Sequence, residues 1–288
     1  MSSRQSLRTQ FTIFVLFGDI ILPRGGSVWT SSLLQLLRLL GVSERAARST
    51  LSRMKRKGWL KAERRGRHSL YRLTPKGERL LSEGGRRIFE PHDWSWDGRW
   101  CLVVYSVPES KRKLRTALRK RLTFLGFGPL GPGRWISAHD RQAEVQALLD
   151  DLGAHAFVQV FSGENLDAGD GQQIVERCWD LRGLNRKYAK FLARWQQDYE
   201  HSALARGNGF SPADCFVQTF WISHEYSTFP QADPNLPAQL LPEGWLGVRA
   251  AGLVDSFRAN LSERANAFIQ DTMASPDGRR GPKSRAHK

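Results

Sequence analysis

Residues 43–73 carry the pattern of an amphipathic helix followed by a tight hairpin, and this stretch constrains the fold more than any other. Ser43 is a good N-cap, and Gly58 stands where the helical pattern ends. Gly66 supplies the turn of the hairpin. The elements predicted around it are helices at residues 11–22, 28–40 and 43–57, strands at 61–65 and 67–73, and a further helix opening at 73–77. This order predicts a winged helix-turn-helix.

The predicted helix at residues 43–57 separates into an apolar face and a cationic face. At about 100° per residue, Ala46, Leu51 and Met54 fall on one side, and Glu44 stands at the helix start. The opposite side carries four arginines and two serines without a carboxylate: Arg45, Arg48, Ser49, Ser52, Arg53 and Arg56. A helix about 10–12 Å across fits the major groove of DNA, where arginine binds guanine bidentately and serine meets bases or phosphates.

The hairpin and the distribution of charge along the chain point to the same partner. The tip of the hairpin carries Arg64, Arg65, Arg67 and His68, which are suited to a phosphate strand or the minor groove. Residues 1–90 hold 19 Lys and Arg against 6 Asp and Glu, whereas residues 91–288 hold 25 against 22. A merely solvated helix face usually mixes both signs. The localised charge therefore predicts double-stranded DNA as partner.

The middle of the chain alternates between strands and helices. Strands are predicted at residues 100–107, 133–137 and 156–161, and helices at 110–125 and 140–152. A β-α-β-α-β order with short links predicts a small ferredoxin-like α+β domain. The helix at 110–125 is strongly basic, through Lys111, Arg112, Lys113, Arg115, Arg119, Lys120 and Arg121. Two interpretations stay open for it: a surface for the phosphates of DNA or of a CoA moiety, or a solvated face in an otherwise acidic domain.

The last third of the chain is predicted to be helical and rich in aromatic residues, with helices at residues 172–201, 211–226 and 246–273. The first of these has a possible break at Gly183, and the last a possible interruption near Leu261. Residues 275–288 have no apolar pattern and are predicted to form a disordered basic tail. The expected fold class is therefore α+β and multidomain.

Neither catalytic nor metal-ligating spacing stands out in the sequence. The three cysteines form no CxxC pair, the seven histidines are scattered, and the usual hydrolase, phosphate-loop and zinc motifs do not occur. No run of about 18 apolar residues predicts a membrane span, and the polar start does not resemble a signal peptide. We therefore expect a cytoplasmic protein that is no enzyme and uses no cofactor, metal or membrane.

Short motifs along the chain resemble one family of bacterial regulators. They are Phe17-Gly18-Asp19, the run from Leu22 to Trp29 (LPRGGSVW), Glu44-Arg45-x-x-Arg48, Gly58-Trp59-Leu60, Tyr71-x-Leu73-Thr74, the run from Val104 to Ser110 (VYSVPES), the run from Leu125 to Leu130 (LGFGPL), His224-Glu225-Tyr226 and Leu240-Leu241-Pro242-x-x-Trp245. Together they cover most of residues 10–270. The chain resembles the PaaX-type repressor family of bacterial phenylacetic acid degradation.

The resemblance implies a cytoplasmic transcriptional repressor that binds an inverted-repeat operator as a homodimer and is released by an aryl acyl-CoA, phenylacetyl-CoA being the type case. With it, we expect four parts: a winged helix-turn-helix at residues 1–90, a ferredoxin-like dimerisation domain at 91–165, a helical effector domain at 166–274, and the tail at 275–288. A DNA-binding architectural protein without an effector is an alternative.

The family's central domain is similar to CRISPR-associated nucleases that place an aspartate at the end of the first strand. Ser106 stands at that position here, and a neutral hydroxyl is a poor ligand for a hard cation. We therefore expect a scaffold for dimerisation. The alternative is a metal-dependent nuclease or RNA-processing enzyme built on this domain.

An aryl thioester would need an aromatic-lined pocket with a few polar anchors. Trp179, Trp221, His224 and Tyr226 are the candidate wall, although aromatic residues at helical spacing are more often core, and His224 alone is more often a satisfied core histidine. The cations close to Trp179 in sequence that we expect to meet the CoA phosphates are Arg182, Arg186 and Lys187.

Overall fold

The computed structural model describes residues 3–88, 96–164, 171–204, 210–229 and 232–274. The chain divides into two compact units. The first unit comprises Met1–Arg86, Trp195–Glu225 and Leu253–Lys288, and the second comprises Arg87–Arg194 and Tyr226–Gly252. This division differs from the predicted domain boundaries, which stay a prediction. The predicted tail at residues 275–288 lies outside the described residues.

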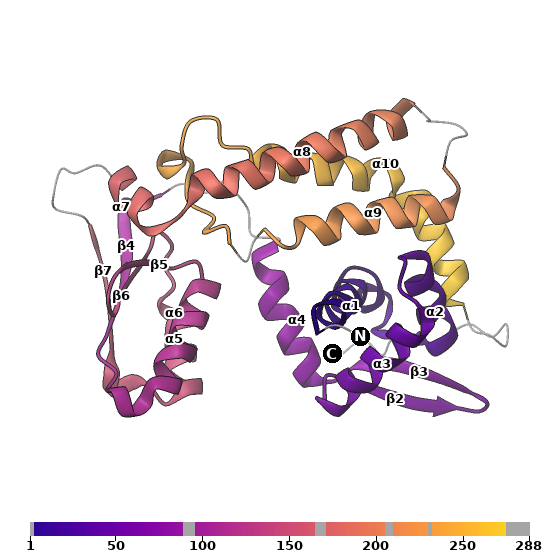
Figure 1. Ribbon diagram of the computed structural model, residues 1–288, viewed down its shortest axis with the longest axis horizontal. Helices are drawn as coiled ribbons and strands as arrows, with labels where there is room; N and C mark the ends of the chain where they lie inside the picture. The colour runs from indigo at the N-terminus through magenta and orange to yellow at the C-terminus, as the bar shows by residue number, and fades with distance from the viewer. Residues whose placement is uncertain (1–2, 89–95, 165–170, 205–209, 230–231, 275–288) are drawn as a thin grey trace. The chain divides into compact units, whose positions relative to one another are not determined.

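The first unit contains the winged helix-turn-helix predicted from the sequence (Figure 1). Its elements are α1 (Ser3–Leu16), a π-helical turn (Phe17–Ile21), β1 (Ser27–Trp29), α2 (Thr30–Leu39), α3 (Glu44–Arg56), β2 (Leu60–Arg65), β3 (His68–Leu73) and α4 (Pro75–Ile88). The three strands form one antiparallel sheet in the order β1-β3-β2. The wing is therefore a three-stranded sheet and not the hairpin alone.

Strand β1 corrects the expectation of a helix from Val28 onward. Val28 pairs with Tyr71, and Trp29 pairs with Leu70, so α2 begins only at Thr30. Valine and tryptophan favour strands, but the partner strand β3 lies about 40 residues later. The pairing is therefore a long-range contact that the local helical pattern did not reveal.

The core of the winged helix-turn-helix is built from the apolar faces of α1, α2 and α3. The Ser43 hydroxyl accepts a hydrogen bond from the backbone N–H of Ala46 at 3.3 Å and so caps α3, as predicted. The side chains of α3 that face the core are Ala46, Ala47, Thr50, Leu51 and Met54. Burying this face leaves the opposite face of α3 to the solvent.

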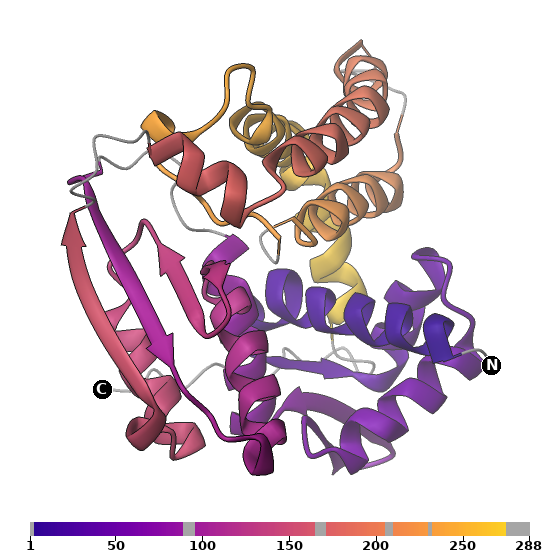
Figure 2. The same cartoon turned by 60° about the vertical axis from the view of Figure 1, so that its left-hand side comes forward.

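The second unit contains a four-stranded antiparallel sheet with strand order β5-β6-β4-β7. Its elements are β4 (Arg99–Tyr105), α5 (Arg112–Phe124), β5 (Gly128–Gly131), β6 (Arg134–Ser137), α6 (Gln142–Leu152) and β7 (Val158–Glu164). In Figure 2, β7 (pink) is seen at the edge of the sheet beside β4 (purple). The order β-α-β-β-α-β confirms the ferredoxin-like prediction. Strand β5 was not predicted, because Gly-Pro-Leu-Gly has a low strand propensity.

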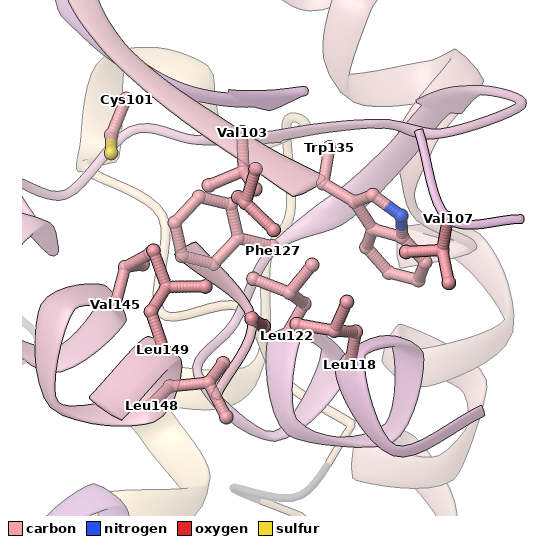
Figure 3. Close-up of a cluster of buried hydrophobic side chains, with 12 residues drawn as sticks. Cys101, Val103, Val107, Leu118, Leu122, Phe127, Trp135, Val145, Leu148 and Leu149 are labelled. Carbon is pink, nitrogen blue, oxygen red and sulfur yellow. The ribbon is translucent and has the colours of Figure 1, made fainter. Parts of the chain in front are cut away.

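Both faces of this sheet are covered. Cys101 and Val103 of β4 face α5 and α6, where they pack with Phe127, Leu118 and Val145 (Figure 3). The opposite face carries a second cluster, to which α7 (Gly171–Cys178) contributes Val175 and Cys178. The other members of this cluster are Trp100, Ile136, Ala138, Leu181, Leu236 and Leu240. Because successive residues of β4 point to opposite faces of the sheet, this strand contributes side chains to both cores.

Three long helices follow α7: α8 (Leu181–Leu204), α9 (Pro212–Tyr226) and α10 (Gly247–Met273). The break that was expected near Gly183 lies just before it, because Asp180 accepts a hydrogen bond from the Gly183 N–H at 2.8 Å and opens α8. Helix α10 runs through Leu261 without interruption. In the part of the chain that the structure describes, none of the helices has the length and apolarity needed to cross a membrane.

Within the first unit, α9 and α10 are tied to the N-terminal helix and the turns after it. Arg258 of α10 donates hydrogen bonds to Asp19, at 3.2 Å, and to the Ser223 hydroxyl of α9, at 3.2 Å. Arg24 donates a hydrogen bond to Asn266 of α10. The C-terminal helices therefore contribute polar anchors to the segment that precedes β1.

Candidate nucleic-acid interface and small-molecule pocket

The outward face of α3 carries the residues predicted to bind DNA. Arg45, Arg48 and Arg56 are exposed, as are Ser49 and Ser52. Arg53 differs from them, because it is half-buried and donates a hydrogen bond to the Thr50 hydroxyl at 2.9 Å. Five of the six predicted side chains are thus exposed on one helix face, and the sixth lies at its margin.

The face is not entirely free of acids, which corrects one expectation. Glu44 reaches along the helix and accepts a hydrogen bond from Arg48 Nε at 2.7 Å, with side-chain exposures of 63% and 59%. Such an exposed i, i+4 pair contributes only about 0.3–0.5 kcal/mol. Arg48 can therefore exchange this carboxylate for a phosphate or a base at little cost.

One cation of this face was missed by the sequence analysis. Lys55 is exposed on α3, seven residues after Arg48 and therefore on the same edge of the helix. The signal was present in the sequence, since the i+7 position falls within about 20° of the starting residue on a helix. Lys55 extends the cationic surface toward the C-terminal end of α3.

The tip of the β2–β3 wing folds back on itself. Gly66 has a φ of 59°, a value that glycine adopts without strain, and its carbonyl accepts a hydrogen bond from Arg64 at 3.2 Å. Arg67 Nε lies 3.1 Å from His68 Nε2, and the His68 ring packs edge-on against Trp29 at 6.1 Å. These contacts hold the tip in one shape and leave its arginines on the surface.

The base of the wing carries one carboxylate among several cations. Glu63 lies 3.0 Å from Lys61, 3.7 Å from Arg72 and 4.0 Å from Arg65. The hydrogen bond from Lys61 is the main reason why the pKa of Glu63 lies below its ordinary value. Lys61 and Arg72 were not among the predicted DNA-binding residues, although they add positive charge to the same sheet.

A pocket of about 550 Å³ lies in the second unit, where α7 meets α8. It contains two of the predicted ligand-binding residues, Trp179 and Arg182. The full lining is Gln172, Val175, Glu176, Arg177, Cys178, Trp179, Asp180, Leu181, Arg182, Leu240 and Pro242. The volume is typical of sites for small molecules, and the lining combines apolar side chains with two arginines and two carboxylates, Glu176 and Asp180.

Two contacts shape this pocket. The Trp179 ring packs directly on Gly128 of β5, where an added Cβ would lie 2.6 Å from the ring. Arg182 donates a hydrogen bond to Glu176 at 3.2 Å, and both side chains are exposed. Burial raises the pKa of the neighbouring Cys178 to about 11, so this thiol stays protonated at neutral pH.

The other predicted ligand-binding residues lie elsewhere. Arg186 is exposed on α8 and does not line the pocket. Trp221 and His224 belong to the first unit, where the His224 ring packs edge-on against Trp221 and against Phe11 of α1, at 4.9 Å in each case. Tyr226 belongs to the second unit. Of the predicted ligand-binding residues, only Trp179 and Arg182 line the pocket.

His224 sits in a packed contact between α9 and α1. Its Nε2 atom lies 3.3 Å from the Thr12 hydroxyl, and burial lowers its pKa to about 4. Phe220 also packs against the ring. This environment matches the alternative stated above, a satisfied core histidine.

The position expected to hold a nuclease carboxylate carries Ser106, which is exposed just after β4. Its backbone N–H donates a hydrogen bond to Phe157. Across the described ranges, no group of three or more His, Cys, Asp or Glu side chains is arranged to hold a metal ion.

Three sequence-family models match the chain in succession. They are described as PaaX-like protein (residues 8–77), PaaX protein central Cas2-like domain (93–175) and PaaX-like protein C-terminal domain (179–271). The solved structure of the uncharacterized protein Rv0674 from Mycobacterium tuberculosis has a similar fold, with a TM-score of 0.58 and 22% identity over 90% of this chain and 96% of that one.

A curated relative, the transcriptional repressor PaaX of Escherichia coli strain K12, is 32% identical over 259 residues, which cover 89% of this chain and 81% of the relative. The three matches follow the order of the winged helix-turn-helix, the ferredoxin-like sheet and the C-terminal helices. The chain therefore belongs to the PaaX family of transcriptional repressors.

Proposed function

We propose that this protein is a cytoplasmic repressor that binds double-stranded DNA through α3 and the β2–β3 wing. The observation that carries the proposal is the outward face of α3, on which Arg45, Arg56 and Lys55 are exposed together with two serines. A helix of this kind reads base edges in the major groove, while the wing arginines bind phosphates or enter the minor groove. The relative named a transcriptional repressor supports the same conclusion.

The operator is an inverted repeat, and the protein binds it as a homodimer. Two copies of α3 then enter successive major grooves about 34–36 Å apart, so that the two-fold axis of the protein coincides with that of the DNA. The second unit carries the dimer contact in this proposal. Ser106 leaves its first strand without the carboxylate that a metal-dependent nuclease would use, so the unit acts as a scaffold and not as an enzyme.

The effector is an aryl acyl-CoA, such as phenylacetyl-CoA, and it binds in the pocket between α7 and α8. Trp179, Val175 and Leu240 supply the apolar wall for the aryl group. Arg177 and Arg182 supply charge for the phosphates, and Arg182 exchanges Glu176 for them. The effector releases the operator only if it binds the DNA-free geometry more tightly than the DNA-bound geometry.

Gel-shift titrations with the DNA upstream of the gene and of its neighbours test the first part. Replacing Arg45 or Arg56 by alanine weakens operator binding by about 1–3 kcal/mol if the side chain binds a base edge. The loss is similar on all sequences if the side chain holds only a phosphate. Arg79→Ala on α4 removes the same charge outside α3 and the wing and serves as the control. Wild-type binding that shows no preference among duplexes contradicts the proposal.

Calorimetric titration with phenylacetyl-CoA, CoA and phenylacetate tests the second part. The thioester binds most tightly, because only it contacts both the apolar wall and the two arginines, Arg177 and Arg182. Trp179→Leu weakens binding of phenylacetyl-CoA while leaving the affinity for CoA nearly unchanged, and Arg182→Gln weakens both. Lys190→Gln on α8 is the matched control for charge. Equal affinity of all variants for the thioester places the effector elsewhere.

A further inference from the structure

We infer that α5 of the second unit carries a second DNA-binding surface, which holds the phosphate backbone of the duplex without reading its sequence. The surface consists of Arg112, Lys113, Arg119 and Lys120, which are called the α5 stripe below. This inference goes beyond the proposed function, because it assigns DNA contact to a unit that the proposal treats as a scaffold.

The distribution of charge in this part of the chain is uneven. Residues 93–175 hold ten Lys and Arg and ten Asp and Glu, and seven of the ten cations lie within residues 111–121, where no carboxylate occurs. The helix is therefore strongly positive, and the rest of this stretch is equally negative. Scattered charge would serve solubility, whereas charge gathered on one helix creates a local positive potential.

The structure places the α5 stripe on one exposed side of the helix. All four of its side chains are exposed, whereas Leu118 and Leu122 on the opposite side are fully buried in the core shown in Figure 3. At about 100° per residue, the four cations occupy one sector of the helix surface, and the sector runs for about 12 Å along the axis. Thr116 and Thr123 are exposed in the same sector.

Two acids pair with α5 through arginines that lie outside the α5 stripe. Glu109 accepts a hydrogen bond from Arg115 at 2.8 Å, and Asp151 lies 3.5 Å from Arg121. Lys111 lies over the ring of Phe157 at 4.7 Å. Within the described parts of the chain, none of the ion pairs involves a member of the α5 stripe, so its four charges remain for an outside partner.

The shape of this surface selects among anionic partners. A small phosphorylated ligand needs cations that converge on one pocket, and the pocket described above lies at α7 and α8, with no α5 residue in its lining. The α5 stripe is convex, and its charges are spread along a helix. Such a surface is complementary to a rod with one phosphate for every 3.4 Å of each strand, which is duplex DNA. Phosphate contacts of this kind position a protein without specifying a sequence.

The test compares two full-length variants that lose the same charge. The stripe variant is R112Q/K113Q/R119Q/K120Q, and the control variant, K187Q/K190Q/R194Q/R249Q, removes two arginines and two lysines from exposed positions of the same unit. Affinity for the operator and for a scrambled duplex is measured between 50 and 200 mM salt. Each phosphate contact that is lost makes the negative slope of log K against log salt shallower by about 0.9.

For the stripe variant we expect a slope shallower by about two or more, with equal loss of affinity on both duplexes. The control variant should retain the wild-type slope. Equal slopes for the two variants would overturn the inference. A single-stranded RNA is titrated beside the two duplexes, and a stripe-dependent loss confined to that RNA would also overturn the inference, because it would assign α5 to another partner. If the stripe variant does not fold, as judged by circular dichroism, the pair R119Q/K120Q repeats the test with an expected change of about one or more.

The outcome also separates this inference from the proposed function. Wild-type protein that binds no duplex overturns both. Wild-type protein whose operator preference depends on Arg45 and Arg56, together with a stripe variant that behaves like the control, overturns the inference alone.

Discussion

Arg258 of α10 donates a hydrogen bond to the carboxylate of Asp19 at 3.2 Å, across 239 positions of sequence. Asp19 lies in the π-helical turn after α1, and the same arginine also holds the Ser223 hydroxyl of α9. Burial raises the pKa of Asp19, and the charge of Arg258 acts in the opposite direction. The C-terminal helix therefore supplies a positive charge that opposes protonation of this carboxylate in the N-terminal part of the first unit.

Removing Arg258 should destabilise the first unit more than removing the charge of Asp19. Arg258→Met leaves a poorly solvated carboxylate without its arginine partner, whereas Asp19→Asn leaves only a neutral amide at that position. In a double-mutant cycle followed by urea denaturation, we expect a coupling of about 1 kcal/mol. Because Asp19 takes up a proton more readily in the folded state, the loss in Arg258→Met should shrink as the pH falls toward the pKa of Asp19. Additive losses that do not vary with pH would contradict this account.

The half-buried His224 should make stability depend on pH. Its pKa of about 4 lies below the ordinary value of 6.5, so the unfolded chain takes up a proton at a higher pH than the folded protein. The stabilising contribution is complete above about pH 6.5 and is lost as the pH falls toward 4. The groups that face the ring, Thr12, Phe11, Phe220 and Trp221, do not titrate in this range. Denaturation midpoints at several pH values should therefore fall more steeply in wild type than in His224→Gln.

Glu44→Gln should strengthen DNA binding and should lower the stability of the folded protein. The substitution removes the carboxylate that occupies Arg48, and it removes a negative charge from the N-terminus of α3. Losing the favourable helix-dipole interaction costs about 0.3–1 kcal/mol. Affinity for duplex DNA at low salt should rise severalfold, whereas the midpoint of thermal unfolding should drop slightly. An unchanged affinity would show that Arg48 does not contact the DNA.

Gly77 should be essential for the corner between the wing and α4. An added Cβ would lie 2.1 Å from the Trp59 carbonyl, and that carbonyl also accepts the backbone hydrogen bond of Thr74 at 3.0 Å. Gly77→Ala should therefore destabilise the protein by about 1–3 kcal/mol. Gly252→Ala in α10 is the matched control, because no atom apart from the adjoining backbone of its own helix lies within 4 Å of the added Cβ. It should stabilise the protein by about 0.5–1 kcal/mol in the same denaturation experiment. Equal effects would contradict this steric explanation.

The elements that follow from local patterns were predictable. The cap at Ser43, the two faces of α3 and the turn at Gly66 depend on residues close in sequence, and all three appear in the structure. Strands β1 and β5 were missed because each is short and is defined by its partner strand. A strand of three or four residues forms only when the rest of the sheet supplies its hydrogen bonds.

The candidate sites divide in the same way. The cationic face of α3 follows from helical periodicity, because a buried apolar side forces the arginines outward. The ligand-binding set was divided by the fold: Trp179 and Arg182 line a pocket, whereas His224 packs against α1. Aromatic residues at helical spacing look alike in sequence whether they face a core or a cavity.

By itself, the sequence determined the winged helix-turn-helix, the order of the ferredoxin-like elements and the family, because these rest on local periodicity, turn chemistry and motifs. Only the tertiary structure decided that Asp19 depends on Arg258 and that the pocket opens beside Trp179. Side-chain reach and packing against distant segments set these contacts. They depend on the positions of atoms in space, which residue spacing along the chain does not encode.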